Sequence, residues 1–245
     1  MKIPYTYLSM AVAILFFAAC NQSSNNPLTA KTKKRQPVNF ANYIIEVATY
    51  KIKKDVKKAD FARLDSMVEV GYTRKQPGYI SKESGIDQDG NWLVVVSWDN
   101  AAHADAGLKE FNHNPLSNGY KNMVDTATAS IKRFSVKDDH SNSLKDEKAY
   151  VIEIATFKAK SEIQRDTFDK RDLQVESDYI SRQTGYIARR IGIAENGERM
   201  MLIFWKTLAD ADAGMKEFSK DQSVADYSKM IDWNTVELKR FQAVN

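Results

Sequence analysis

Hydrophobic and other residues alternate along residues 43–50, and this two-residue period predicts a β-strand. The next segment repeats its large apolar residues at the spacing of an amphipathic helix; these are Phe61, Leu64, Val68 and Tyr72. A second strand is predicted from Tyr79, and an Asp-Gln-Asp-Gly turn at residues 87–90 leads into a run at residues 92–98 that is apolar except for one serine. The pair predicts a hairpin whose second strand is buried on both faces.

A helix, a shorter helical piece and a last strand complete the pattern. Asn100 can cap a helix over residues 101–111, and Pro115 opens a further helical piece that ends near Met123. Residues 130–136 alternate again as a strand. The predicted order β-α-β-β-α-β is that of a ferredoxin-like unit, which places the chain in the α+β class.

The whole pattern of predicted elements occurs twice in the chain. The segment Tyr-Ile-Ile-Glu-Val-Ala-Thr-Tyr at residues 43–50 returns 107 positions later, and the same offset carries the 104–111 segment onto 211–218 without a gap. Self-similarity at one fixed register indicates a tandem duplication. The predicted parts are a first repeat at 42–137, a polar linker at 138–148 and a second repeat at 149–245.

The first twenty residues have the features of a bacterial export signal. Lys2 supplies a positive start, and the apolar run at residues 8–19 is too short for a helix that crosses a hydrocarbon core of about 30 Å. The run ends in Phe-Ala-Ala-Cys20, which resembles the lipobox, so Cys20 is predicted to be acylated and to attach the protein to the lipid bilayer. The alternative is an ordinary cleaved signal with an incidental cysteine. Residues 21–41 are polar and are predicted to form a disordered tether, so the protein is expected in the bacterial cell envelope, lipid-anchored in the periplasm or at the outer membrane.

Composition narrows the function classes further. The chain has 245 residues and 43% hydrophobic residues, enough for one large domain or two domains of about 100 residues each. Its 36 Lys plus Arg face 32 Asp plus Glu, and five of the basic residues precede residue 40, so the remainder is near neutral and does not predict nucleic-acid binding. One Cys excludes an intramolecular disulfide, and three scattered His give no zinc-ligand spacing. Without a phosphate-binding loop or a nucleophile elbow, the sequence predicts no cofactor and no metal.

The junction Trp-Asp-Asn-Ala-Ala at residues 98–102, with its continuation to Tyr120, resembles the antibiotic biosynthesis monooxygenase family. That resemblance implies the dimeric α+β barrel, in which two ferredoxin-like units pack sheet to sheet. The duplication then implies that one chain supplies both halves, as a monomer with an intrachain pseudo-dimer. The family includes cofactor-free oxygenases of aromatic polyketides, haem-degrading enzymes and members with no known reaction, so membership alone names no reaction.

The resemblance also bears on individual aromatic residues. The Trp that closes the third strand in the family matches Trp98 and Trp205, which implies an indole wall beside an aromatic substrate; the alternative is a core anchor. Tyr79 and Tyr186 repeat as well and are candidate substrate-binding residues, with packed rings and hydrogen-bonded hydroxyls as the alternative. Haem-degrading relatives carry an Asn on the first strand, where both copies here have Glu, and a haem-ligating His on the second helix. That helix carries Gly107, Lys109 and Phe111 here, and His103 lies one turn earlier, where a surface residue is expected.

Two glutamates at equivalent positions are the candidate catalytic groups. Alternation along the first strand places Glu46 on a face with apolar residues, and Glu153 has the same place in the second copy. If this face lines the barrel interior, burial raises the pKa of each carboxyl group and makes it a candidate general base. The alternative is a structural ion pair with Arg133 or Arg240, which repeat on the last strand and are also candidate substrate-binding residues.

These observations predict an envelope lipoprotein that binds a small aromatic or otherwise apolar molecule and is a candidate to oxidise it without a metal. The alternative is a non-catalytic ligand-binding or interaction module of the same fold. If one half alone keeps a site, the first copy, which carries His103 and His113, is expected to be that half.

Overall fold

A computed structural model describes residues 43–141, 144, 147, 150–218 and 220–244. The first half contains β1 (Ile44–Ile52), α1 (Lys58–Gly71), η2 (Thr73–Lys75), β2 (Tyr79–Ile86), β3 (Asn91–Trp98), α2 (Ala101–His113), α3 (Pro115–Met123) and β4 (Val124–Asp139). The second half contains β5 (Val151–Ala159), α4 (Arg165–Asp178), η4 (Ile180–Arg182), β6 (Tyr186–Ile193), β7 (Arg199–Trp205), α5 (Leu208–Phe218), η5 (Gln222–Val224), α6 (Ala225–Met230) and β8 (Ile231–Ala243). The predicted signal peptide, the tether and Cys20 lie outside these residues.

Local sequence signals account for several element boundaries. The Asn100 side chain accepts a hydrogen bond from the backbone N–H of His103 and caps α2, as the sequence predicts. Asn114 caps α3 in the same way through the N–H of Leu116, with Pro115 at the first helical position. Gly90 adopts a φ of 80° in the turn between β2 and β3, a conformation that favours glycine. The helices and the hairpin therefore follow from the residues at their ends.

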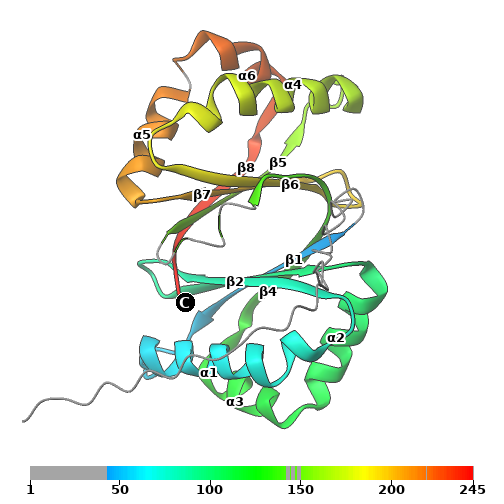
Figure 1. The fold of residues 1–245 in the computed structure, drawn as a ribbon, viewed down its shortest axis with the longest axis vertical. Coiled ribbons are helices and arrows are strands. Elements are labelled where there is room, and N and C mark those ends of the chain that lie inside the picture. Colours follow the sequence, from blue (N-terminus) through cyan, green and yellow to red (C-terminus); the bar gives the residue numbers. More distant parts are fainter. Residues whose placement is uncertain (1–42, 142–143, 145–146, 148–149, 219, 245) are drawn as a thin grey trace, which may run out of the picture. The chain divides into compact units, whose positions relative to one another are not determined.

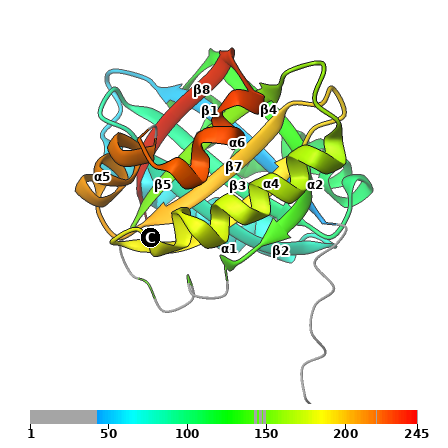
Figure 2. The ribbon, with the colours of Figure 1, turned by 90° about the horizontal axis from the view of Figure 1, so that it is seen from above.

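The eight strands of the described residues form one closed antiparallel barrel in the order β1-β3-β2-β8-β5-β7-β6-β4 (Figures 1 and 2). Within each half the strands follow the order β4-β1-β3-β2 or β8-β5-β7-β6. Two seams join the halves. In one, β2 pairs with β8 and Gly85 lies opposite Ala243; in the other, β4 pairs with β6 and Val136 lies opposite Gly192. The result is the α+β architecture of a dimeric α+β barrel in which a single chain closes the sheet.

The last strand of the first half is longer than the sequence pattern predicts. Alternation predicts a strand at residues 130–136, whereas β4 begins at Val124 and continues to Asp139. Its start pairs with the end of β1, and its last residues, Asp138 and Asp139, pair with β6 of the other half. Pairing with a partner strand supplies the hydrogen bonds that polar residues need to remain extended, and that partner is 50 or more residues distant in the sequence.

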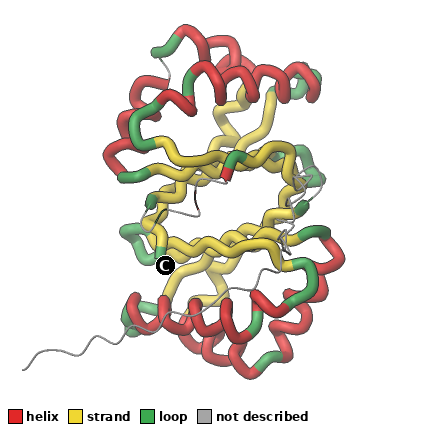
Figure 3. Tube along the Cα trace, viewed as in Figure 1, coloured by secondary structure: helices red, strands yellow, loops and turns green. Residues whose placement is uncertain are grey.

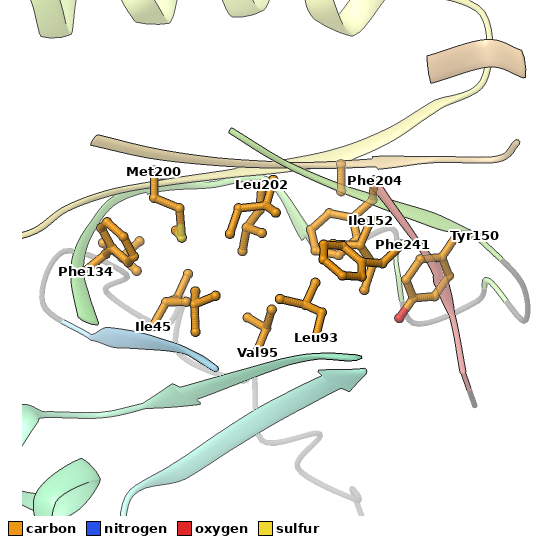
Figure 4. Packing of buried hydrophobic residues seen from close by; sticks show 14 of the residues in the cluster. Ile45, Leu93, Val95, Phe134, Tyr150, Ile152, Met200, Leu202, Phe204 and Phe241 are labelled. Atoms are coloured by element: carbon orange, nitrogen blue, oxygen red, sulfur yellow. The ribbon is translucent and has the colours of Figure 1, made fainter. Parts of the chain in front are cut away.

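The barrel interior is filled by side chains from both halves. Ile45, Leu93, Val95 and Phe134 meet Ile152, Met200, Leu202, Phe204 and Phe241 between the two sheets (Figure 4). Val47 and Tyr43 belong to the same cluster, so the odd-numbered residues of β1 face the interior. The expectation that the face carrying Glu46 lines the interior is therefore wrong. The two sheets need an apolar layer between them, and the odd face of β1 is the more apolar one.

The helices cover the outer faces of the barrel, α1, α2 and α3 on one half and α4, α5 and α6 on the other (Figures 1 and 3). A separate apolar cluster lies under each helix layer: Phe61, Trp92 and Trp98 belong to the first, and Phe168 and Trp205 to the second. The face of β1 and β5 that carries the glutamates therefore contacts helices. No helix among the described residues is long and apolar enough to span a membrane.

Candidate functional site

A cavity of about 70 Å³ lies between the sheet and the helices of the second half. Its walls are apolar side chains from β5, β7, β8 and the helical segments, and Glu153 contributes the one ionisable carboxyl group among the lining residues. Trp233 is 52% exposed and Leu238 is 38% exposed, and both line the cavity, so it reaches the protein surface at β8. The remaining lining residues include Phe157, Tyr179, Met201, Trp205, Phe218 and Tyr227.

Glu153 is held at the cavity wall by an arginine. Its side chain is 1% exposed, and its Oε2 accepts a hydrogen bond of 2.5 Å from Nε of Arg240. The same guanidinium contacts Asp212 on α5 and donates to the Ala211 carbonyl at 3.1 Å. Burial raises the pKa of Glu153 above its ordinary value, although the Arg240 hydrogen bond and charge lower it. The structure thus contains the ion pair that was the alternative interpretation, and its carboxyl group has a pKa that burial raises.

The first half repeats this arrangement with less burial. Glu46 Oε2 accepts a hydrogen bond of 2.6 Å from Nε of Arg133, which also contacts Asp105. The Glu46 side chain is 11% exposed and that of Arg133 is 28% exposed, against 1% and 17% for the second-half pair. Burial raises the pKa of Glu46, and Arg133 lowers it. Both pairs join a first strand to a last strand directly across the sheet, because Glu46 is opposite Arg133 and Glu153 is opposite Arg240.

The two tryptophans anchor a helix on the sheet. A Cβ atom added to Gly107 would lie 2.7 Å from Trp98, and one added to Gly214 would lie 2.9 Å from Trp205. Glycine therefore lets α2 and α5 approach the indole rings closely. Trp98 and Trp205 are both buried, and their indole N–H groups have no hydrogen-bond partner among the described residues. The Trp205 ring also lines the cavity, so this residue both anchors the helix and forms part of the cavity wall.

The repeated tyrosines pack and bond as their alternative reading expects. Tyr79 packs edge-on against Trp98 at 6.4 Å, and Tyr186 packs edge-on against Trp205 at 6.2 Å. The Tyr186 hydroxyl donates to Glu176 at 2.5 Å. Burial raises the pKa of Tyr79 to about 12, and it also raises the pKa of Tyr186. Neither tyrosine is among the residues that line the cavity, so the site hypothesis loses these two members.

The sequence analysis did not predict the buried cluster of charged side chains that lies next to the cavity. Arg189 is fully buried and contacts Asp172 and Glu176, and the Tyr227 hydroxyl donates to Asp172 at 2.6 Å. Tyr227 also lines the cavity, so it links the cluster to the site. The sequence contains a signal for this cluster, because an acidic and a basic residue recur at the offset of 107. Their counterparts in the first half, Asp65 and Lys82, also form an ion pair.

Haem does not fit the described residues. The three histidines, His103, His113 and His140, are partly or fully exposed, and none lines the cavity. His103 is 38% exposed at its side chain and pairs with Asp99, as expected of a surface residue. A cavity of about 70 Å³ is also much smaller than a porphyrin. No cluster of three or more metal-binding side chains occurs in the described part of the chain.

The cavity lies in the half that lacks His103 and His113, although the first copy was expected to keep the site. The offset of 107 places Leu108 and Thr126 of the first half at the positions of Met215 and Trp233. Trp233 supplies the aromatic rim of the cavity, and its counterpart in the first half is a small polar residue. The arrangement in the second half can bind an apolar molecule and present it to one buried carboxyl group.

Comparison with known proteins supports the fold. No protein-family model and no curated protein sequence matches the chain. A protein from Fusobacterium nucleatum described as a putative monooxygenase superposes with a TM-score of 0.58 and 11% identity, over 84% of this chain and 93% of that one. An anthrone oxidase-like protein gives a TM-score of 0.57 and 13% identity, over 83% and 92%. Chlorite dismutase from Candidatus Nitrospira defluvii gives 0.54 and 9%, over 81% and 90%. Identities this low show a shared fold and leave the activity open.

Proposed function

We propose that this chain is a bacterial envelope lipoprotein whose second half binds a small aromatic or otherwise apolar molecule. The observation that carries the proposal is the cavity beside Glu153, which has apolar walls and an aromatic rim at Trp233. Ligand sites are usually apolar pockets with a few polar groups that fix orientation. Here the one carboxyl group among the lining residues is that of Glu153. It suits a ring that bears a hydroxyl group.

The size of the cavity favours a small ligand. The cavity of about 70 Å³ has about half the volume of an apolar cavity that holds benzene. A single ring therefore has to extend to the open rim at Trp233 and Leu238, and a fused tricyclic molecule would need both side chains to move. Hydroquinones are the appropriate first probes, with anthrones as the larger comparison.

A cavity-filling substitution tests the binding site. We expect wild-type protein to bind a hydroquinone probe saturably in calorimetric titrations and Ala155→Leu to lose that binding, because Ala155 lines the cavity and the added carbons would occupy it. Ala48→Leu is the matched control, since Ala48 occupies the same position in the first half. Equal loss in both variants, or binding that survives Ala155→Leu, would place the ligand elsewhere.

A second candidate function is cofactor-independent oxidation of the bound ligand. Its support is the position of Glu153 at the cavity wall, where burial raises its pKa and makes it a stronger base than an exposed glutamate. With an anthrone, Glu153 removes a proton from the activated CH₂ group and the carbanion transfers electrons to dioxygen; one oxygen atom remains in the product as a carbonyl, and the other leaves as water. With a hydroquinone, Glu153 removes a hydroxyl proton, and the ring transfers two electrons and two protons to dioxygen, which gives a quinone and hydrogen peroxide.

Oxygen uptake distinguishes oxidation from binding alone. On a panel of hydroquinones and anthrones with a chelator present, Glu153→Gln should lower uptake by about 10²- to 10⁴-fold. Glu46→Gln should leave uptake unchanged, since the cavity described above is lined by Glu153. Unchanged uptake in Glu153→Gln would leave this glutamate a structural residue. Uptake that is absent from the wild type on every substrate would favour the non-catalytic binding module.

The envelope location and the two ferredoxin-like repeats belong to the same proposal. Acylation at Cys20 is supported by the lipobox-like residues that end there, and duplication is supported by the ungapped offset of 107. Metabolic labelling with a fatty-acid probe should mark the wild type and leave Cys20→Ser unmarked. Equal labelling of the two would contradict the anchor.

A further inference from the structure

Glu83 and Arg190 occupy the same position in the two halves and contact each other. They are 107 residues apart, which is the offset that superposes the copies, yet one is an acid and the other a base. Arg190 donates from Nη1 and Nη2 to the two carboxylate oxygens of Glu83, at 2.9 and 2.8 Å. The exposed fraction is 5% for the Arg190 side chain and 9% for that of Glu83. A bidentate contact of this kind fixes the orientation of both side chains.

The pair lies where the two halves are related by symmetry. The Gly85–Ala243 pair of one seam is matched by the Gly192–Val136 pair of the other, and both residue pairs of the β2–β8 seam have their counterparts 107 positions away in the β4–β6 seam. The halves are therefore related by an approximate twofold axis. A residue that contacts its own counterpart must lie at that axis.

The surroundings make the charges costly to leave unpaired. The Arg190 guanidinium lies 5.3 Å from the ring centre of Phe204, which belongs to the apolar barrel interior. Its Nε is 3.6 Å from Asp139, and that carboxylate also accepts a hydrogen bond from the Tyr43 hydroxyl. A buried charge that loses its partner destabilises a fold far more than an exposed one.

We propose that Glu83 and Arg190 form a selection element that allows a first half to close only on a second half. Two first halves joined in the same way would bury one Glu83 against another, and two second halves would bury one Arg190 against another. Like charges at a desolvated axis disfavour both combinations. The accepted partner is the complementary half, from the same chain or from a second copy.

Selection of the partner matters because the two halves are synthesised one after the other. The first half is complete on the ribosome before its own partner exists, and domains generally fold from the N-terminal end during synthesis. Its interior face is apolar, so the first half of a neighbouring nascent chain is a competing partner. A negative charge at the axis of that wrong pair leaves the first half available for its own second half.

Charge reversal in the full-length chain tests the pairing. Glu83→Arg and Arg190→Glu should each lower Tm by about 6–20 °C, and the double variant should regain part of that loss, since the pair is restored while Asp139 remains beside the carboxylate introduced at position 190. Lys220→Glu is the control, because it breaks an exposed pair with Glu217 and should change Tm by no more than about 2 °C. Single reversals without effect, or a double variant no more stable than the worse single variant, would overturn the proposal.

Refolding the two single variants together tests selection between chains. Unfolded in urea, mixed and refolded at about 10 µM, Glu83→Arg and Arg190→Glu should form a mixed dimer in which both oppositely charged contacts are restored. Pairing between chains at that concentration is disfavoured by about 10²-fold, whereas two restored contacts favour it by about 10⁴-fold or more. Light scattering should detect this dimer in the mixture and in neither variant alone. A mixture that yields monomers only would overturn the selection of partners, even if single variants fold poorly.

Discussion

Removing Arg240 tests how the carboxyl group at the cavity is held. In Arg240→Met the Glu153 carboxylate, 1% exposed at its side chain, loses the hydrogen bond of 2.5 Å from Nε. Breaking a buried pair by removing one partner costs about 3–5 kcal/mol, and we expect the lower end of that range because Arg240 is 17% exposed. For a chain of this size, about 3 kcal/mol corresponds to a fall in Tm of about 6–12 °C at pH 7.

The pH dependence of the loss separates a charge effect from a packing effect. Burial raises the pKa of Glu153 in the folded protein, so its contribution to stability is fully present below its ordinary pKa of 4.5 and is lost as pH rises through the folded value. Removal of Arg240 raises the folded pKa further, because the arginine lowers it. The difference in Tm between wild type and variant should therefore be large at pH 7 and small at pH 4.

Thermal unfolding followed by circular dichroism at both pH values provides the measurement, with two controls. Arg133→Met removes the counterpart arginine, and it should cost less because both members of that pair are more exposed. Glu153→Gln with Arg240→Met removes both charges and should recover most of the loss. If Arg240→Met costs the same at pH 4 as at pH 7, the destabilisation comes from lost packing, and the reasoning about the carboxyl group is wrong.

Two further predictions concern the barrel. Gly192→Ala should lower Tm by about 2–12 °C, because the new Cβ would lie 2.6 Å from Cβ of Phe134 in the interior, whereas Gly90→Asn, in an open turn, should change Tm by no more than about 2 °C; equal effects would refute the close approach at the seam. Residues 42–137 expressed alone should aggregate without forming a discrete dimer, since the interior face of one half is apolar while two first halves would bury one Glu83 against another; a stable monomer in light scattering would contradict the shared core.

The secondary structure of this protein is largely determined by local sequence. Asn100 caps α2, Pro115 opens α3, and the apolar run at residues 92–98 becomes a strand buried on both faces, since each signal acts over a few residues. Repetition at one offset then extends every local prediction from the first half to the second. The same repetition singled out Glu46 and Glu153, and it offered an ion pair with Arg133 or Arg240 as the alternative to a catalytic role.

Tertiary structure decided which face of each strand is inside and where a cavity forms. Alternation separates the two faces of β1 but does not say which one contacts the other half, and packing of the two sheets placed Ile45 inside and Glu46 under the helices. The site is likewise set by differences between copies, such as Trp233 for Thr126, whose consequences depend on what lies across the gap. Nothing in the sequence around Glu83 and Arg190 indicates that the two side chains contact each other. Only closure of the barrel brings them together at its axis, because that contact joins residues 107 positions apart.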